Sequence, residues 1–220
     1  MGKIHVNVKP DFLESISTYT PVKALAELIW NGFDADSKQV QVFLEYNDAE
    51  GLSAIRIRDY GEGINYSSVE QLFGNLGESW KKSKGRSSTG RSFHGKNGKG
   101  RFQAFALGQK AEWNTTFQQD GKFYTYKIIG SVQNLTDFDT TEAKEINSTT
   151  STGTEVAILG LPKSYNSLIQ DSIYLELSKI FAAYLTEYPD LRLIYEGSVV
   201  DPKNAQNHCK NYDLGEIEIN

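Results

Sequence analysis

The clearest hydrophobic pattern in the chain is a helical repeat over residues 21–35. Its apolar positions return to one face about every 3.6 residues, and they are Val22, Leu25, Ile29 and Phe33. A threonine before a proline suits a helix start, because the hydroxyl caps free N–H groups and proline fits the first turn. Thr20 and Pro21 therefore predict where this helix begins, and it should end between Phe33 and Ala35.

The opposite face of the same helix carries Glu27, Asn31 and Asp34. Their spacing of four and then three residues puts them within an arc of about 60°. Such a stripe is most simply a solvated helix surface. The alternative is the floor of a metal–phosphate site, and the rest of the chain has to decide between the two.

Alternation of apolar and polar residues predicts strands separated by turns. The expected strands are 4–8, 40–46, 52–58, 111–117, 123–129, 131–137, 154–159 and 191–195. The Asp-Gly pair at 120–121 predicts a type I′ hairpin turn. Further helices are expected after a Ser67 cap, over 98–107 and over 167–184, with a loop over 139–152. Strands and helices do not alternate strictly, so we expect an α+β fold with one mostly antiparallel mixed sheet covered on one face by helices.

Composition limits the classes of protein to which the chain could belong. The 220 residues are 39% hydrophobic, which allows a sizeable core, and the net charge of −5 gives no general reason to expect nucleic-acid binding. Cys209 is the only cysteine, so no internal disulfide can form, and the three histidines lack zinc spacing. The sequence shows neither the apolar stretch of a secretory signal nor one long enough to span a membrane. We expect a cytoplasmic protein.

Positive charge is concentrated in residues 77–101, against the acidic mean. The basic residues there are Lys81, Lys82, Lys84, Arg86, Arg91, Lys96, Lys99 and Arg101. The segment is also rich in glycine and serine. It is either a solvated basic loop or a loop that closes over a polyanion. His94, within it, is expected to be merely exposed.

Three further stretches carry candidate chemistry. Asp59, at the end of a strand, can accept a hydrogen bond from an exocyclic amine, and Gly61 and Gly63 would let the backbone approach a flat ring. Residues 95–101, Gly-Lys-Asn-Gly-Lys-Gly-Arg, open a helix whose free N–H groups would suit phosphate. Thr154 follows a glycine at the start of a strand. The glycine-rich stretch matches neither a Walker A loop nor a dinucleotide fingerprint.

These stretches, in this order, resemble the motifs of the GHKL ATPases. That superfamily includes the gyrase B subunit, the ninety-kilodalton heat-shock chaperones, sensor histidine kinases and MutL-type proteins, with the related MORC ATPases; a MutL/MORC-like domain is expected here. The Glu27–Asn31–Asp34 helix resembles their N-box, and 59–63 resembles the adenine box. The resemblance covers about residues 21–161 and implies a Bergerat-type two-layer sandwich.

The resemblance also implies roles for residues. Glu27 would be the general base that activates water, Asn31 would ligate Mg²⁺, and Asp59 would bind the adenine amine with Thr154 in support. The implied nucleotide-binding residues are Asn31, Asp34, Asp59, Gly61, Gly63, Ile64, Gly95, Lys96, Asn97, Gly98, Lys99, Gly100, Arg101 and Thr154. The part of the basic loop from residue 77 to residue 97 would be the ATP lid. Asp34 would shape the site without acting chemically.

The implied function is Mg²⁺-dependent ATP binding and hydrolysis that drives lid closure and homodimerisation. A downstream effector would then act in DNA maintenance or anti-phage defence, with any nucleic acid bound through other domains. Two alternatives are a non-hydrolysing ATP switch and, less favoured because of Glu27, a histidine kinase catalytic domain. Residues 1–200 would form the ATP-binding domain. Residues 201–220 would start a following segment or transducer domain, in a chain that is a fragment.

Overall fold

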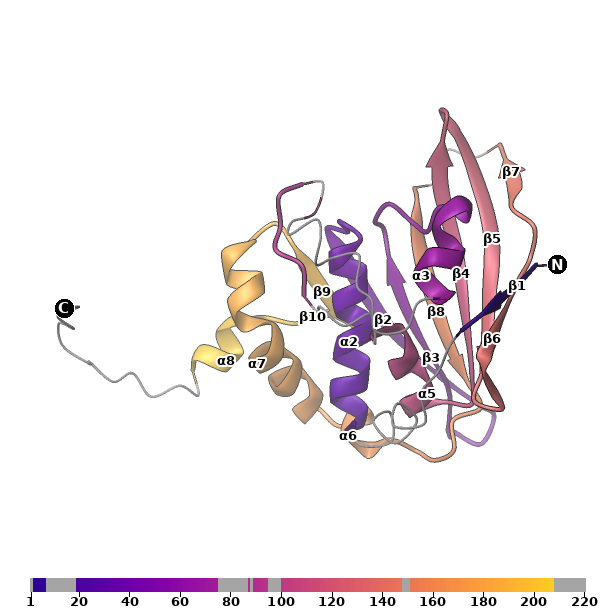
Figure 1. Ribbon diagram of the computed structural model, residues 1–220. Helices are drawn as coiled ribbons and strands as arrows, with labels where there is room; N and C mark the ends of the chain where they lie inside the picture. The colour runs from indigo at the N-terminus through magenta and orange to yellow at the C-terminus, as the bar shows by residue number, and fades with distance from the viewer. Residues whose placement is uncertain are drawn as a thin grey trace, which may run out of the picture.

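The computed structural model describes residues 2–6, 19–74, 87, 89–94, 100–147 and 151–207. Within these ranges, one sheet of ten strands forms the frame of the domain (Figure 1). The strands are β1 (Gly2–His5), β2 (Gln39–Tyr46), β3 (Leu52–Asp59), β4 (Lys110–Gln119), β5 (Lys122–Ser131), β6 (Asn134–Thr140), β7 (Lys144–Ile146), β8 (Gly153–Leu159), β9 (Arg192–Tyr195) and β10 (Ser198–Val199).

The described helices together contain fewer residues than the strands. They are α2 (Pro21–Asp34), α3 (Val69–Gly74), α5 (Ala104–Leu107), α6 (Asn166–Ile169), α7 (Ser172–Glu187) and α8 (Lys203–Gln206), with 3₁₀ turns η1 (Tyr66–Ser68) and η2 (Gly100–Gln103). None of the helices in the described ranges is both long and apolar enough to cross a membrane.

The strand order is β1-β6-β5-β4-β8-β3-β2-β9-β10, with β7 paired to β5. The pairings are antiparallel except that of β2 with β9, which is parallel. Strand β3 lies between β2 and β8, so the end of β3 at Asp59 lies beside the start of β8 at Gly153. Sheet topology thus brings together two of the predicted motifs that are far apart in sequence.

The helices cover one face of the sheet, which gives the domain its two layers (Figure 1). Ile55 and Ile57 of β3 are buried on the covered face, under α2. Arg56, between them, points to the other face, where it pairs with Glu45 and Glu155 on the neighbouring strands. The predicted α+β class, with a mostly antiparallel mixed sheet covered on one face, is confirmed.

Several local predictions are also confirmed. The Thr20 hydroxyl caps α2 by accepting a hydrogen bond from the Lys23 N–H at 3.4 Å, and Pro21 is the first helical residue. Asp120 and Gly121 have φ angles of 51° and 77°, as a type I′ turn between β4 and β5 requires.

Other local predictions are wrong at the boundaries. Strand β6 begins at Asn134, not at residue 131, and β7 forms inside the predicted 139–152 loop. Strand β7 is exposed and polar because it lies at an edge, so its sequence shows no apolar alternation. The predicted 167–184 helix is two helices, because the backbone turns extended at Gln170. The cap before α3 is Asn65, whose side chain accepts from the N–H of Ser67.

Candidate functional site

The polar face of α2 meets the start of η2. A Cβ added at Gly100 would lie 3.2 Å from both Oδ1 and Nδ2 of Asn31, and 3.4 Å from Oε2 of Glu27. The side chains of Glu27 and Asn31 are only partly exposed. These two side chains therefore face another segment of the chain across a narrow gap, and they do not lie on a freely solvated helix surface.

Asp34, the third residue of the polar stripe, is buried at 7% exposure. Its Oδ1 accepts a hydrogen bond of 2.9 Å from the backbone N–H of His94. Asp34 thus holds the chain just before the glycine-rich stretch against the C-terminal half of α2. This contact is with the protein's own backbone, and a contact of Asp34 with a nucleotide stays a prediction.

Asp59 ends β3 as a buried carboxyl group with two backbone donors. Its Oδ1 accepts from the N–H of Gly61 at 2.9 Å and from the N–H of Thr154 at 3.2 Å. Burial raises the pKa of Asp59 from 3.8 to about 7, against the opposing effects of the two N–H donors and of Arg58. Among the described residues, both donors use Oδ1, and Oδ2 accepts no hydrogen bond.

The glycines around Asp59 are required by contacts between backbones. A Cβ at Gly61 would lie 2.1 Å from the carbonyl oxygen of Ala35, and one at Gly63, where φ is 72°, would lie 2.1 Å from that of Thr116. Gly63 also adopts the left-handed conformation that favours glycine. The 59–64 loop is therefore wedged between the end of α2 and β4. A direct role of these glycines beside a purine ring stays a prediction.

Thr115 is a site residue that the sequence reasoning missed. It is fully buried, and its Oγ1 accepts from the N–H of Ile64 at 2.8 Å and lies 3.1 Å from Oγ1 of Thr154. A signal was available, because Thr115 occupies an inward position of β4 between Trp113 and Phe117. A hydroxyl at such a position needs a polar partner, and here it joins the Asp59 loop to β8.

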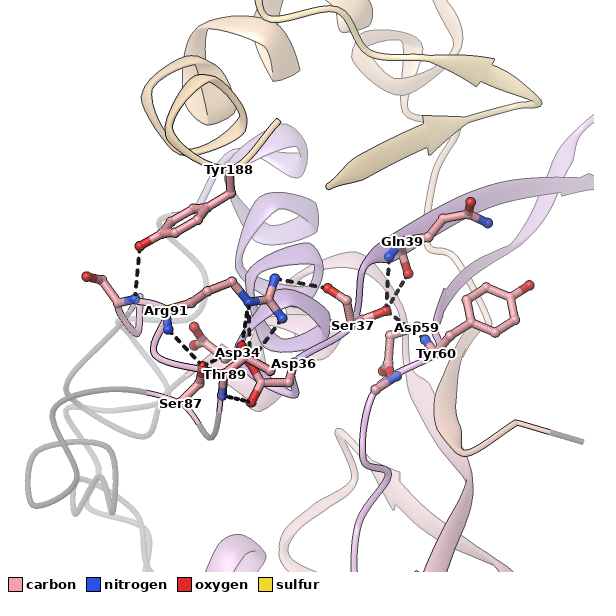
Figure 2. A network of polar contacts seen from close by, with 12 residues as sticks. Asp34, Asp36, Ser37, Gln39, Asp59, Tyr60, Ser87, Thr89, Arg91 and Tyr188 are labelled. Carbon is pink, nitrogen blue, oxygen red and sulfur yellow. Dashed lines mark hydrogen bonds and ion pairs between the residues drawn. The ribbon is translucent and has the colours of Figure 1, made fainter. Parts of the chain in front are cut away.

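Asp36 and Arg91 form a buried ion pair that the sequence reasoning also missed (Figure 2). Their side chains are 8% and 9% exposed, and the Asp36 Oδ1 to Arg91 Nη2 distance is 3.1 Å. Asp36 also accepts from the hydroxyl of Thr89 at 2.6 Å. Arg91 was counted with the basic loop, but its guanidinium group is buried in this ion pair with Asp36.

The same network continues to the loop that carries Asp59. Nη1 of Arg91 donates to the carbonyl oxygen of Ser37 at 3.0 Å, and the Ser37 hydroxyl oxygen accepts from the N–H of Tyr60 at 2.8 Å. Figure 2 shows this path from Arg91 through Ser37 to Tyr60. The end of the basic segment and the Asp59 loop are thus held by one connector, Asp36 and Ser37, just after α2.

His94 is exposed, as predicted, with 43% of its side chain accessible, but its ring still makes contacts. It stacks on Trp30, with ring centroids 4.1 Å apart and an angle of 12° between the planes. Its Nε2 lies 3.9 Å from Oε1 of Glu27. Trp30 itself is 7% exposed and contacts Phe181 and Tyr184 of α7.

Several predicted nucleotide-binding residues lie outside the described part of the chain. They are Gly95, Lys96, Asn97, Gly98 and Lys99, and the side chain of Arg101 belongs with them. Of the predicted lid, the structure describes residues 87 and 89–94. The described elements bring Glu27, Asn31 and Gly100 together at one place. They bring Asp59, Gly61, Gly63, Ile64 and Thr154 together at another, and the backbone of residues 35–37 joins the two.

Residues 19–157 match a family model described as histidine kinase-, DNA gyrase B-, and HSP90-like ATPase. The chain belongs to this family of GHKL ATPases. The match contains α2, the Asp59 loop and the start of β8, in the order that the motifs require. The resemblance to the superfamily is thereby confirmed, together with the Bergerat fold. The chain matches none of the curated proteins.

Proposed function

We propose that this GHKL domain binds ATP with Mg²⁺ and hydrolyses it. One observation carries the proposal: the partly exposed Glu27 and Asn31 converge on Gly100, while Asp59 lies in a buried loop joined to the same helix end. Adenosine triphosphate has an amine at one end and phosphates at the other, and this supports pairing the Asp59 acceptor with the first and the Gly100 turn with the second.

Asp59 is proposed to accept the adenine amine. Its Oδ1 is occupied by the N–H groups of Gly61 and Thr154, which fix the carboxyl plane. Oδ2 is the remaining acceptor. Thr154 supports this arrangement through its N–H, and we propose that its hydroxyl, 3.1 Å from that of Thr115, supports it further through water.

Glu27 and Asn31 are proposed to act at the phosphate end. The place that a Cβ of Gly100 would take is lined by the amide group of Asn31, through Oδ1 and Nδ2, and by Oε2 of Glu27. Hard oxygen atoms such as Oδ1 of Asn31 suit Mg²⁺, which neutralises phosphate charge when bound. Glu27 would orient water and take its proton. Lys96, Lys99 and Arg101 would contact the phosphates, with Gly95, Asn97 and Gly98 shaping their turn.

The wider function is proposed from the family. ATP would close the lid and drive homodimerisation, and a downstream effector, in DNA maintenance or anti-phage defence, would respond. We propose residues 1–200 as the ATP-binding domain of a cytoplasmic protein and 201–220 as the start of the next segment. Helix α8 of that segment packs on α7, where Ala205 is 4% exposed. Nothing in the net charge of the 220-residue chain, −5, favours direct DNA binding.

The test has a binding arm and a turnover arm. Isothermal titration with a non-hydrolysable ATP analogue and Mg²⁺ should give saturable heat with the wild type. Phosphate release should fall by about 10²- to 10⁴-fold in Glu27→Gln, which keeps the side-chain shape, while analogue binding remains. Binding without turnover in the wild type would favour the non-hydrolysing switch. No binding by a folded wild type would refute the nucleotide site.

A further inference from the structure

We propose that His94 positions Glu27, so that one carboxylate oxygen is held by His94 while the other faces Gly100. This inference rests on the proposed role of Glu27 as general base. It makes His94 a positioning residue, supplied by the segment before the glycine-rich stretch, and it gives that segment a part in the hydrolysis step.

Three contacts fix the place of His94. Its backbone N–H donates to Asp34, its ring stacks on Trp30, and its Nε2 faces Glu27. Glu27, Trp30 and Asp34 are spaced i, i+3 and i+7, so they lie along one side of α2. His94 therefore lies lengthwise against two turns of the helix, and rotation of its ring would lose the stacking contact.

The chain on either side of the contact adds to its rigidity. Arg91, three residues before His94, is anchored in the buried pair with Asp36. Trp30, on which the His94 ring stacks, itself contacts two aromatic rings of α7. Its ring centroid lies 4.5 Å from that of Phe181 and 4.9 Å from that of Tyr184. A histidine in an exposed loop ordinarily samples several rotamers. Here one face of the ring stacks on an aromatic cluster, and the ion pair anchors the backbone three residues before it.

The two oxygens of Glu27 then have different surroundings. Oε1 lies 3.9 Å from Nε2 of His94, whereas Oε2 lies 3.4 Å from the place that a Cβ of Gly100 would take. The first distance is longer than a hydrogen bond, as is common for catalytic contacts before the substrate binds. Oε2 is the oxygen directed at the proposed phosphate position, so it is the one placed to orient water.

Two substitutions test this role by steady-state ATP hydrolysis and by titration with a non-hydrolysable analogue. His94→Ala should lower kcat by about 10- to 100-fold, the loss typical of a misplaced catalytic group. Its analogue Kd should stay within about twofold, because ground-state binding is untouched. His94→Gln should recover much of the lost kcat, since an amide N–H can still face Oε1. His5→Ala is the matched control and should keep the wild-type kcat. His5 is an exposed histidine at the end of β1, and it pairs with Asp137 of β6.

A double-mutant cycle separates positioning from other roles. If His94 acts through Glu27, His94→Ala should cause no further loss in a Glu27→Gln background. An independent, multiplicative loss there would overturn the inference. A normal kcat in folded His94→Ala, or a weakened analogue Kd as its main effect, would overturn it too, the latter by making His94 a phosphate ligand. A wild type without turnover, or a fully active Glu27→Gln, would instead overturn the proposed function and the role of His94 with it.

Discussion

Replacing Asp59 by asparagine should stabilise the nucleotide-free domain at neutral and alkaline pH while it weakens adenine binding. Burial raises the pKa of Asp59 from 3.8 to about 7. A carboxyl whose pKa rises on folding prefers its neutral form in the folded state. The difference corresponds to about 4 kcal/mol against the charged form once the group ionises in both states.

The sign of the pH dependence follows from the bound proton. Below about pH 4 the folded and unfolded chains both hold the proton, so Asp59 contributes no destabilisation. Between about pH 4 and 7 the folded domain keeps a proton that the unfolded chain has lost, and the free energy of unfolding falls as pH rises. Above about pH 7 both forms are charged and the full destabilisation is present. The asparagine side chain of the variant is neutral at every pH, so this slope should disappear.

Asparagine can keep the local contacts, because its Oδ1 can accept from the N–H groups of Gly61 and Thr154 as the carboxylate does. The melting temperature of Asp59→Asn should therefore exceed that of the wild type at pH 8, by about 2–4 °C for each kcal/mol recovered. The two proteins should converge near pH 4. Asp48→Asn, at an exposed turn position, is the control and should follow the wild-type curve.

The assay is thermal unfolding from pH 4.5 to 8.5 without nucleotide, followed by titration with ADP and with inorganic triphosphate. Asp59→Asn should bind ADP more weakly and triphosphate as the wild type does, because only the amine acceptor has changed. A variant that is less stable at pH 8, or that keeps the wild-type slope, would refute the reasoning about burial. An equal loss for ADP and triphosphate would refute the adenine assignment.

Two further predictions concern the residues that tie the site together. Arg91→Met should lower the free energy of unfolding by about 3–5 kcal/mol, since it leaves Asp36 buried without the Arg91 cation. Chemical denaturation measures this, and a loss similar to that of Lys163→Met, at an exposed lysine, would contradict it. Thr115→Val should cost about 1–3 kcal/mol because it strips the N–H of Ile64 of its acceptor. Thr186→Val, at an exposed threonine on α7, is the control, and an equal effect of both changes would contradict the special role of Thr115.

Local signals in the sequence located the elements of the site well. The Thr20–Pro21 start, the apolar stripe of α2 and the Asp120–Gly121 turn each depend on neighbouring residues, and each is confirmed. The polar stripe was also identified, but patterning alone could not decide whether it was a solvated surface. That decision needed Gly100, which is distant in the sequence and reaches α2 only through the fold.

Contacts between distant residues account for what the sequence did not show. Arg91 was counted in the basic segment of the predicted lid because of its charge, and only the structure reveals its pairing with Asp36, fifty-five residues earlier. Gly61 was explained by a flat ligand, yet the carbonyl oxygen of Ala35 already excludes a side chain there. In both cases the residue type was informative, but its partner depended on tertiary packing that no local pattern encodes.

The proposed adenine end of the site is fixed by contacts of the fold itself. The 59–64 loop contacts the end of α2 at Gly61 and β4 at Gly63, and the Asp59 carbonyl oxygen would lie 2.2 Å from a Cβ on Gly153. The end of α2, strand β4 and the start of β8 thus all contact this short stretch of backbone. Asp59 is consequently rigid as well as buried, and the conformational entropy of ordering it is lost during folding. Preorganisation of this kind raises affinity by reducing the ordering that must accompany binding, so adenine recognition should depend little on the basic segment that is proposed to hold the phosphates.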